Sequence, residues 1–348
     1  ASRRSLMRID FDASSCYDRI IPSIASLAAR SFGQHKALCF IHATFLQQAK
    51  YVLKTKLGLS DEGFSHCQLH PIYGTGQGSA NSPVIWALIS SRLFDAHAAR
   101  AYGATFFSPD RSLQLPIFMI GFVDDSNACV NDFANSNQSP EILLQRATAD
   151  AQLWNDLLCR SGGALEIPKC LYQLAYYGFT AAGAPVLKAL PQQQANVRIQ
   201  ELSHANSTPL KYISPYVARK TLGCYKSPST NFKASLQHIA SIATEKSEAV
   251  LNNFITAESA HRYYYSVYLP SVTYSFPTNT IPERHLRKVQ NASIRPILNR
   301  MGYAKSTPHA IIYGPKSLGG IGLRSFYDEQ GSSQMELVLK HFRSSTMV

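Results

Sequence analysis

Apolar and polar residues alternate along short stretches in the first half of the chain, a pattern typical of strands that are half-buried in a sheet. Residues 6–12 (LMRIDFD) alternate in this way and end on Asp12. Residues 118–130 form two apolar runs on either side of Asp124 and Asp125, which predicts a hairpin in the protein interior with two carboxylates at its tip. The pattern therefore places acidic residues at the ends of two predicted strands.

Apolar residues at helical spacing predict further elements in the same half, and glycines separate them. Helices are predicted over residues 20–32, 36–48, 84–101 and 140–160, and strands or hairpins over 50–72 and 171–187. For the last helix we expect an inner face made of Leu143, Leu144, Ala147, Ala151 and Leu158. These elements supply enough apolar surface for a packed core.

A glycine-rich loop over residues 74–79 precedes one of these predicted helices. Free backbone N–H groups at the start of a helix suit a phosphate group or a nucleotide, so the loop is a candidate binding element. The alternative is an ordinary flexible loop in which Ser82 caps the helix and Pro83 takes its first position. The loop alone does not decide between the two.

Glutamine, asparagine, serine and proline dominate residues 188–215, a composition typical of an exposed connector. We therefore divide the chain into a first domain, 1–190, a connecting segment, 191–225, and a second domain, 226–348. The second domain is predicted to be mainly helical, with helices over 234–255, 258–268, 283–298 and 334–342.

One of these helices carries a basic face. Arg284, Arg287 and Lys288 lie at positions i, i+3 and i+4, so they share one side of the helix. Such a face is suited to gripping a phosphate backbone, and a plain solvated surface is the alternative.

The 348-residue chain has a net charge of +12, although only 16% of its residues are charged. Residues 190–348 hold 18 Lys and Arg against 8 Asp and Glu, so most of the excess lies in the second half. A polyanion such as nucleic acid, or a membrane surface, is the partner that this charge indicates. We expect nucleic acid rather than a membrane.

The chain has no apolar run near the roughly 18 residues that a membrane-spanning helix needs, and nothing in it resembles a signal peptide. Its seven cysteines are scattered and lack C-x-x-C spacing, which argues for reduced thiols. We therefore expect an intracellular protein, in the cytoplasm or the nucleus.

Asp12, Asp124 and Asp125 are predicted to meet at one edge of a sheet. Carboxylates at close range repel one another unless a cation lies between them. Two Mg²⁺ ions, with Mn²⁺ as the alternative, are the cations such a trio suits, and they would activate a primer 3′-hydroxyl and stabilise a leaving pyrophosphate. The alternative for Asp124 and Asp125 is an ordinary turn, because aspartate caps its own turn backbone. Asp10 is expected to point away from the site, because adjacent strand positions alternate faces.

The acids and the glycine loop belong to longer motifs that follow one another in a recognisable order. Residues 12–18 (DASSCYD) place an aromatic residue five positions after an aspartate, residues 76–83 (GQGSANSP) contain a Gln-Gly pair, and residues 122–125 (FVDD) have an aromatic-x-Asp-Asp pattern. In order and spacing these resemble the first three motifs of the palm of reverse transcriptases, particularly those of non-LTR retroelements and related group II-type enzymes.

Three later segments extend the resemblance. Residues 163–169 (GALEIPK) resemble the fourth motif of the family, and residues 221–223 (TLG) look like its primer grip. Residues 319–323 (GGIGL) are similar to a Gly-Gly-Leu-Gly segment in the C-terminal region of such elements.

The resemblance implies roles for individual residues. Asp12, Asp124 and Asp125 would be the catalytic metal ligands, and Tyr17 the steric gate that excludes a ribose 2′-hydroxyl. The nucleotide-binding residues would be Ala13 (through its carbonyl), Tyr17, Gln77, Gly78 and Lys169, the last as an acid for the pyrophosphate. Nucleic acid would be held by Leu222, Gly223, Arg284, Arg287 and Lys288.

The resemblance also implies the fold and the reaction. The fold would be α+β, a right-hand polymerase palm with an antiparallel sheet and helices packed on one face, followed by a mainly helical thumb-like domain. The reaction would be RNA-directed DNA synthesis, in which a dNTP extends a DNA primer on an RNA template.

Only about eleven residues precede Asp12, whereas the family has its fingers region before the first motif. We therefore expect the fingers to be largely missing from this chain. One alternative function is a nucleic-acid-binding retroelement fragment without catalysis. A second is an RNA-dependent RNA polymerase, which shares the palm.

Overall fold

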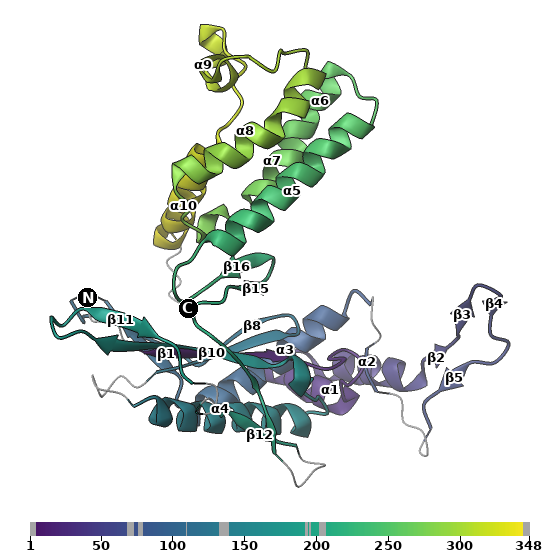
Figure 1. Ribbon diagram of the computed structural model, residues 1–348. Helices are drawn as coiled ribbons and strands as arrows, with labels where there is room; N and C mark the ends of the chain where they lie inside the picture. The colour runs from purple at the N-terminus through teal and green to yellow at the C-terminus, as the bar shows by residue number, and fades with distance from the viewer. Residues whose placement is uncertain are drawn as a thin grey trace. The chain divides into compact units, whose positions relative to one another are not determined.

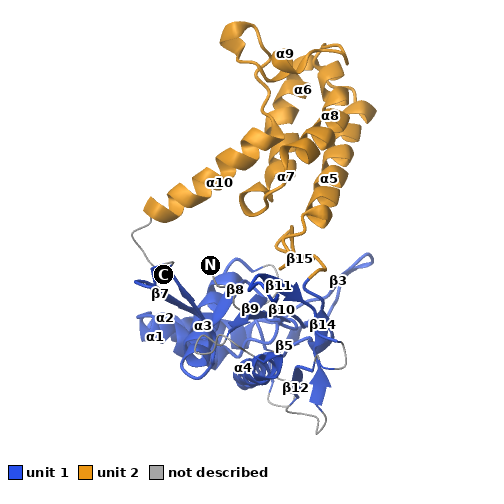
Figure 2. Cartoon of the chain, turned by 60° about the vertical axis from the view of Figure 1, so that its left-hand side comes forward, with its two compact units in different colours: residues 1–215 blue, residues 216–348 orange. Residues whose placement is uncertain are grey.

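The computed structural model describes residues 5–67, 73–75, 79–108, 110–131, 139–191, 194, 196–201 and 207–343. The chain is a mixed α and β protein that forms two compact units, Ala1–Pro215 (unit 1) and Tyr216–Val348 (unit 2), coloured separately in Figure 2. The division between them falls after Pro215. The expectation that residues 188–215 form an exposed connector is wrong, because they belong to unit 1 and bury Val197, Ile199 and Leu210 in its core.

The central sheet of unit 1 has the order β11–β10–β1–β9–β8, with all neighbours antiparallel, and β14 pairs in parallel with β10. Its strands are β1 (Leu6–Asp12), β8 (Met119–Phe122), β9 (Asp125–Val130), β10 (Leu171–Phe179), β11 (Pro185–Lys188) and β14 (Lys211–Ile213). β1 therefore lies in the middle of the sheet, and the strand predicted over 6–12 is confirmed. The turn between β10 and β11 confirms the hairpin predicted in the region 171–187.

One face of this sheet is covered by helix, as Figure 1 shows for α4. The helices of unit 1 are α1 (Pro22–Ser31), α2 (Lys36–Gln48), α3 (Ser82–Ala98) and α4 (Pro140–Arg160). Met7, Ile9 and Phe11 of β1 pack in one buried cluster with Trp154 and other residues of α4. The inner face predicted for α4 is confirmed, because all five of its residues are buried.

Short hairpins complete unit 1. The strands β2 (Lys50–Tyr51), β3 (Lys54–Thr55), β4 (Gly58–Leu59) and β5 (Phe64–Ser65) form an arm that follows α2 in Figure 1. Two further pairs are β6 (Ala104–Phe107) with β7 (Gln114–Ile117), and β12 (Arg198–Gln200) with β13 (Ser207–Pro209).

The prediction that the Asp-Asp hairpin lies wholly in the interior is wrong for its first strand. β8 is the edge strand of the sheet, and Ile120 and Phe122 are 52% and 58% exposed. β9 has a paired neighbour on both sides and buries Ala128 and Val130 completely. An apolar run marks a strand but does not show whether that strand is central or at the edge.

Unit 2 is mainly helical. Its elements are β15 (Arg219–Thr221), β16 (Cys224–Lys226), α5 (Lys233–Asn252), α6 (Ala257–Tyr263), a π-helical stretch (Tyr264–Tyr268), α7 (Leu269–Thr273), α8 (Glu283–Arg300), α9 (His309–Tyr313) and α10 (Phe326–Arg343). Their buried apolar residues form one cluster, which includes Tyr264, Tyr268 and Phe276. In the part of the chain that the structure describes, no helix is both long and apolar enough to cross a bilayer.

The last helix begins eight residues earlier than the predicted start at residue 334. Phe326 is completely buried, and Gln330, one turn later, exchanges hydrogen bonds with the backbone of Ile281 (2.9 and 3.1 Å). Two tertiary contacts therefore anchor a polar, glycine-containing turn that local hydrophobic periodicity does not identify as helix.

Candidate active site

The three predicted acids meet at one end of the central sheet. Asp12 is the last residue of β1, and Asp125 is the first residue of β9 and its direct cross-strand partner. Residues directly opposite in an antiparallel pair have Cβ atoms about 4.5–5.5 Å apart. Asp124 precedes Asp125 in the loop that joins β8 to β9. The register therefore brings together three carboxylates from positions more than a hundred residues apart.

The loop that carries these acids has an unusual backbone conformation. Val123 has a φ of 56°, in the left-handed region that β-branched residues rarely adopt. Its carbonyl accepts a hydrogen bond from the indole Nε1 of Trp86, a buried residue of α3. The indole thus holds the backbone directly before Asp124, a role that the sequence does not suggest.

Negative charge accumulates at this end of the sheet. The pKa of the Asp125 carboxyl is raised, first by partial burial and then by the nearby carboxylates of Asp124 and Asp12. Burial followed by the charge of Asp124 also raises the pKa of the Cys16 thiol to about 11. Like charges that raise a neighbour's pKa in this way are typical of a site built to receive a cation.

The donor chemistry suits Mg²⁺ or Mn²⁺, because both prefer carboxylate oxygens. Among the described residues, however, no group of three or more His, Cys, Asp or Glu side chains is already arranged to hold a metal ion. Asp12, Asp124 and Asp125 thus match a divalent cation in the chemistry of their donor atoms, although their side chains do not form a metal site in this structure.

The segment that resembles the fourth motif lies beside Asp12. Ala13 forms a β-bridge with Leu165, and the backbone N–H of Glu166 donates to the carbonyl of Asp12 (2.9 Å). The Nζ atom of Lys169 lies 3.9 Å from Oδ1 of Asp12, with most of its side chain exposed. Two of the predicted nucleotide-binding residues, Ala13 and Lys169, are thus adjacent to a predicted metal ligand.

Tyr17 lies in the turn after β1, against the start of the glycine-rich loop. The N–H of Thr75 donates to the carbonyl of Tyr17 (3.0 Å). Gly74 has a φ of 98°, and a Cβ there would lie 2.6 Å from Cα of Asp18, so only glycine fits. The pKa of the Tyr17 phenol is raised by burial and, to a smaller extent, by the charges of Cys16 and Asp124.

The two ends of the glycine-rich loop are fixed. The buried hydroxyl of Thr75 donates to the hydroxyl of Ser82 (2.6 Å), the first residue of α3. The predicted pocket residues Gln77 and Gly78 lie outside the described residues. The contacts of Thr75 show only that the flanks of their loop are anchored beside Tyr17.

The expectation that Asp10 points away from the site is wrong. Because residues two apart on a strand share a face, Asp10 lies on the same face of β1 as Asp12, while Ile9 and Phe11 face the core. Asp10 is 5% exposed, and Nε of Arg8 donates to its Oδ1 (2.8 Å). Consecutive residues of a strand point to opposite faces of the sheet, whereas residues two positions apart, such as Asp10 and Asp12, point to the same face.

The predicted primer-grip residues belong to unit 2. Leu222 and Gly223 form the two-residue turn between β15 and β16, both with positive φ (47° and 80°). The hydroxyl of Tyr274 donates to the carbonyl of Leu222 (3.0 Å) and holds this turn against the helices of the unit.

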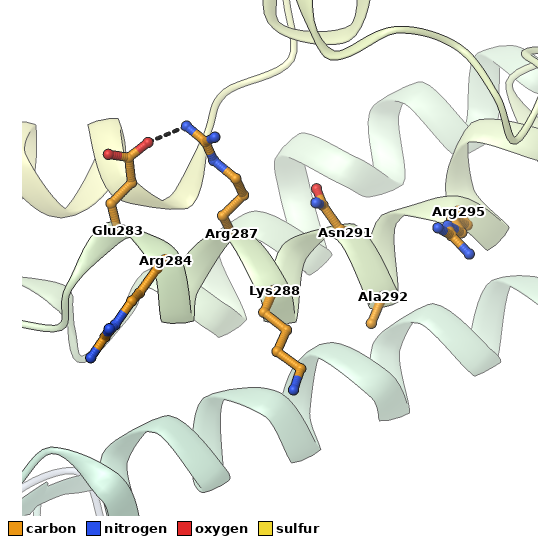
Figure 3. Close-up of a pocket in the computed structure, with 7 residues that line it drawn as sticks. All are labelled: Glu283, Arg284, Arg287, Lys288, Asn291, Ala292 and Arg295. Carbon is orange, nitrogen blue, oxygen red and sulfur yellow. Dashed lines mark hydrogen bonds and ion pairs between the residues drawn. The ribbon is translucent and has the colours of Figure 1, made fainter.

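The predicted basic face of α8 lines a pocket of about 650 Å³. Figure 3 shows Arg284 and Lys288 extending from one side of the helix, while Arg287 bonds to Glu283 on another. All the residues that line this pocket come from α8: Glu283, Arg284, Arg287, Lys288, Asn291, Ala292 and Arg295. Arg284, Lys288 and Asn291 lie at positions i, i+4 and i+7 of α8. Extending this series by one more helical turn reaches Arg295, so the sequence pattern could have identified it.

No protein-family model matches the chain, and no curated protein matches it. Among solved structures, it is similar to apo telomerase from Candida tropicalis truncated from its C-terminal domain, with 16% identity, a TM-score of 0.36, and coverage of 51% of this chain and 32% of that one. It is also similar to telomerase in complex with a TWJ fragment of telomeric RNA. For the Candida tropicalis protein the identity is 10%, the TM-score 0.36, and the coverage 99% of this chain and 48% of that one. For the Candida albicans protein the identity is 11%, the TM-score 0.32, and the coverage 97% of this chain and 49% of that one. The chain thus spans between a third and a half of the length of these telomerases.

Proposed function

We propose that this chain is the palm and thumb portion of a reverse transcriptase of the non-LTR retroelement type, which extends a DNA primer on an RNA template. The observation that carries the proposal is the cross-strand pairing of Asp12 with Asp125, next to Asp124. Like charges directly opposite each other destabilise a strand pair, and a bound cation would offset this repulsion.

Asp12, Asp124 and Asp125 are the residues that would hold the divalent cations. When bound, two such cations supply Lewis-acid activation of the primer 3′-hydroxyl and stabilise the charge on the leaving pyrophosphate. The work of the protein itself is to position these groups, because phosphoryl transfer needs little covalent chemistry from an enzyme.

Lys169 and Tyr17 flank these acids in positions suited to the nucleotide. The exposed ammonium of Lys169, next to Asp12, neutralises or protonates the pyrophosphate as it leaves. Tyr17 follows Asp12 in a turn whose backbone is bonded to Thr75, and its ring would exclude a ribose 2′-hydroxyl.

The α8 pocket is the proposed contact for the nucleic-acid backbone. Arg284, Lys288 and Arg295 recur at one-turn and two-turn intervals, so their charges form a row that follows a line of phosphates.

The test is primer extension by the full chain with Asp124 changed to asparagine. This change keeps the size of the side chain and removes its charge, so template and primer should bind nearly as before. Because a metal ion contributes several kcal/mol to the transition state, the extension rate should fall by at least about a thousandfold.

Asp61→Asn is the matched control, because Asp61 is an exposed aspartate in the β2–β5 arm. It should extend primers at the wild-type rate. Comparable extension by the Asp124→Asn and Asp61→Asn variants would rule out the proposed catalytic role.

A further inference from the structure

A single guanidinium connects the two strands that carry the predicted metal ligands. Nε of Arg8 donates to Oδ1 of Asp10 on β1 (2.8 Å), and Nη2 of Arg8 donates to Oδ1 of Asn127 on β9 (2.7 Å). Arg8 therefore binds one side chain on each strand.

The register shows where this connection lies. Asp12 faces Asp125 in one row of the sheet, and Asp10 faces Asn127 in the next row. The bonds from Arg8 thus end in the row directly beneath the carboxylate pair, on the same face of the sheet. A shift of β1 against β9 would have to break them.

The carboxylate of Asp10 is buried, so its bond to Arg8 matters for the stability of the fold. Asp10 is 5% exposed, and a buried carboxylate requires a paired and hydrogen-bonded partner. The Arg8 side chain is itself about one-third exposed, and its planar fork fixes the direction of each bond. The opposite face of β1 packs Met7, Ile9 and Phe11 into the core, so the whole row is held between a packed face and a bonded one.

We propose that Arg8 is a positioning residue that sets the separation of Asp12 from Asp125, and thereby the affinity of the site for divalent cations. This inference rests on the proposed function. The bonds of Arg8 go to residues one row away from Asp12 and Asp125, and changes at such indirect positions typically alter coupled binding by about 2–30-fold. Asn127 is its acceptor on β9, and Asp10 its acceptor on β1.

A rival explanation is that Arg8 only neutralises the buried charge of Asp10. The double variant Arg8→Gln with Asp10→Asn separates the two, because it removes both charges of this pair together. Arg92→Gln serves as the control, since Arg92 forms an exposed ion pair with Asp95 within α3.

The experiment measures Mn²⁺ affinity of the full chain by electron paramagnetic resonance, together with thermal unfolding. We expect the double variant to unfold close to the wild-type temperature and to bind Mn²⁺ about 2–30-fold more weakly. Arg92→Gln should bind as the wild type does. Wild-type Mn²⁺ affinity in the double variant would overturn the positioning role.

The Asp124→Asn variant, measured in the same experiment, distinguishes the proposed metal site from the proposed role of Arg8. If the wild type binds Mn²⁺ and Asp124→Asn abolishes that binding, the proposed metal site stands whatever Arg8 does. If the wild type binds no Mn²⁺, both proposals fail, because there is then no metal whose ligands Arg8 positions.

Discussion

Val123 stores backbone strain directly beside the predicted metal ligands. A β-branched residue with a φ of 56° is destabilised by about 1–3 kcal/mol relative to an ordinary conformation. The indole of Trp86, which bonds to the Val123 carbonyl, helps to keep it there. Strain of this kind is expected where a turn must present particular side chains rather than maximise stability.

The variant Val123→Gly tests this interpretation. Glycine adopts positive φ without strain but loses about 0.5–1 kcal/mol through its freer unfolded chain, so we expect a net gain of up to about 2.5 kcal/mol in the free energy of unfolding. Chemical denaturation would measure it. A loss of more than about 1 kcal/mol would show that Val123 is not strained.

At the level of residues, the sequence identifies the acids but not what holds them. Asp12, Asp124 and Asp125 are recognisable because they follow strand patterns in a known motif order. Arg8 and Trp86 are not, because their roles depend on a strand register and a helix contact between positions far apart in the chain. The same register places Asp10 on the face of the site.

At the level of elements, α4 anchors the segment that leads to the β8–β9 hairpin. The buried carboxylate of Asp150 accepts hydrogen bonds from the backbone N–H groups of Tyr102 (2.8 Å) and Gly103 (3.0 Å). These residues directly precede β6, and the β6–β7 hairpin continues into β8. Burial raises the pKa of the Asp150 carboxyl in spite of these bonds.

A raised pKa in the folded state gives this anchor a defined pH dependence. The folded protein binds the Asp150 proton more tightly than the unfolded chain does. The stability that this proton gives the folded state is therefore present below the ordinary aspartate pKa of 3.8. It is lost as pH rises through the higher pKa that Asp150 has in the folded protein.

We therefore expect wild-type protein to lose stability relative to Asp150→Asn as pH rises above 3.8. Thermal unfolding of both proteins across this pH range measures the difference in their stability, with Asp61→Asn as the control for an exposed aspartate. A gap that stays constant, or that changes in the opposite direction, would contradict this assignment.

The elements also show where sequence patterns succeed. In α4 a proline marks the start and a buried apolar stripe runs along the helix. The bounds of α2 and α4 match their predictions. β8 and the start of α10 do not, since edge position and a contact from Gln330 to Ile281 are properties of the assembled fold. Local sequence patterns therefore predict helices and strands more reliably than they predict which of these elements contact one another.

At the level of the whole molecule, charge separates the two units. Unit 2 carries 16 Lys and Arg against 7 Asp and Glu, whereas unit 1 carries 18 against 15. The acids of the proposed active site belong to unit 1, and the α8 pocket belongs to unit 2. The proposed division of labour is therefore catalysis in one unit and backbone contact in the other.

This division predicts the salt dependence of nucleic-acid binding. Each lysine or arginine that neutralises a phosphate contributes about one unit to the slope of log K against log salt concentration. The double variant Arg284→Gln with Lys288→Gln should therefore bind an RNA–DNA duplex with a slope shallower by about two.

The matched control is Arg262→Gln with Lys305→Gln, which removes the same charge from unit 2 outside the pocket. Its slope should stay close to that of the wild type in a fluorescence anisotropy titration. Equal slopes for the two double variants would remove α8 from the proposed interface.

The most direct test of the central claim is single-nucleotide extension of a DNA primer annealed to an RNA template by the full chain. The four templates differ only in the next base, and dNTPs are offered beside NTPs with Mg²⁺ or with EDTA. We predict that Mg²⁺ permits addition of the complementary deoxynucleotide in each case, with ribonucleotides disfavoured. Absence of templated addition, or addition that persists in EDTA, would contradict the account.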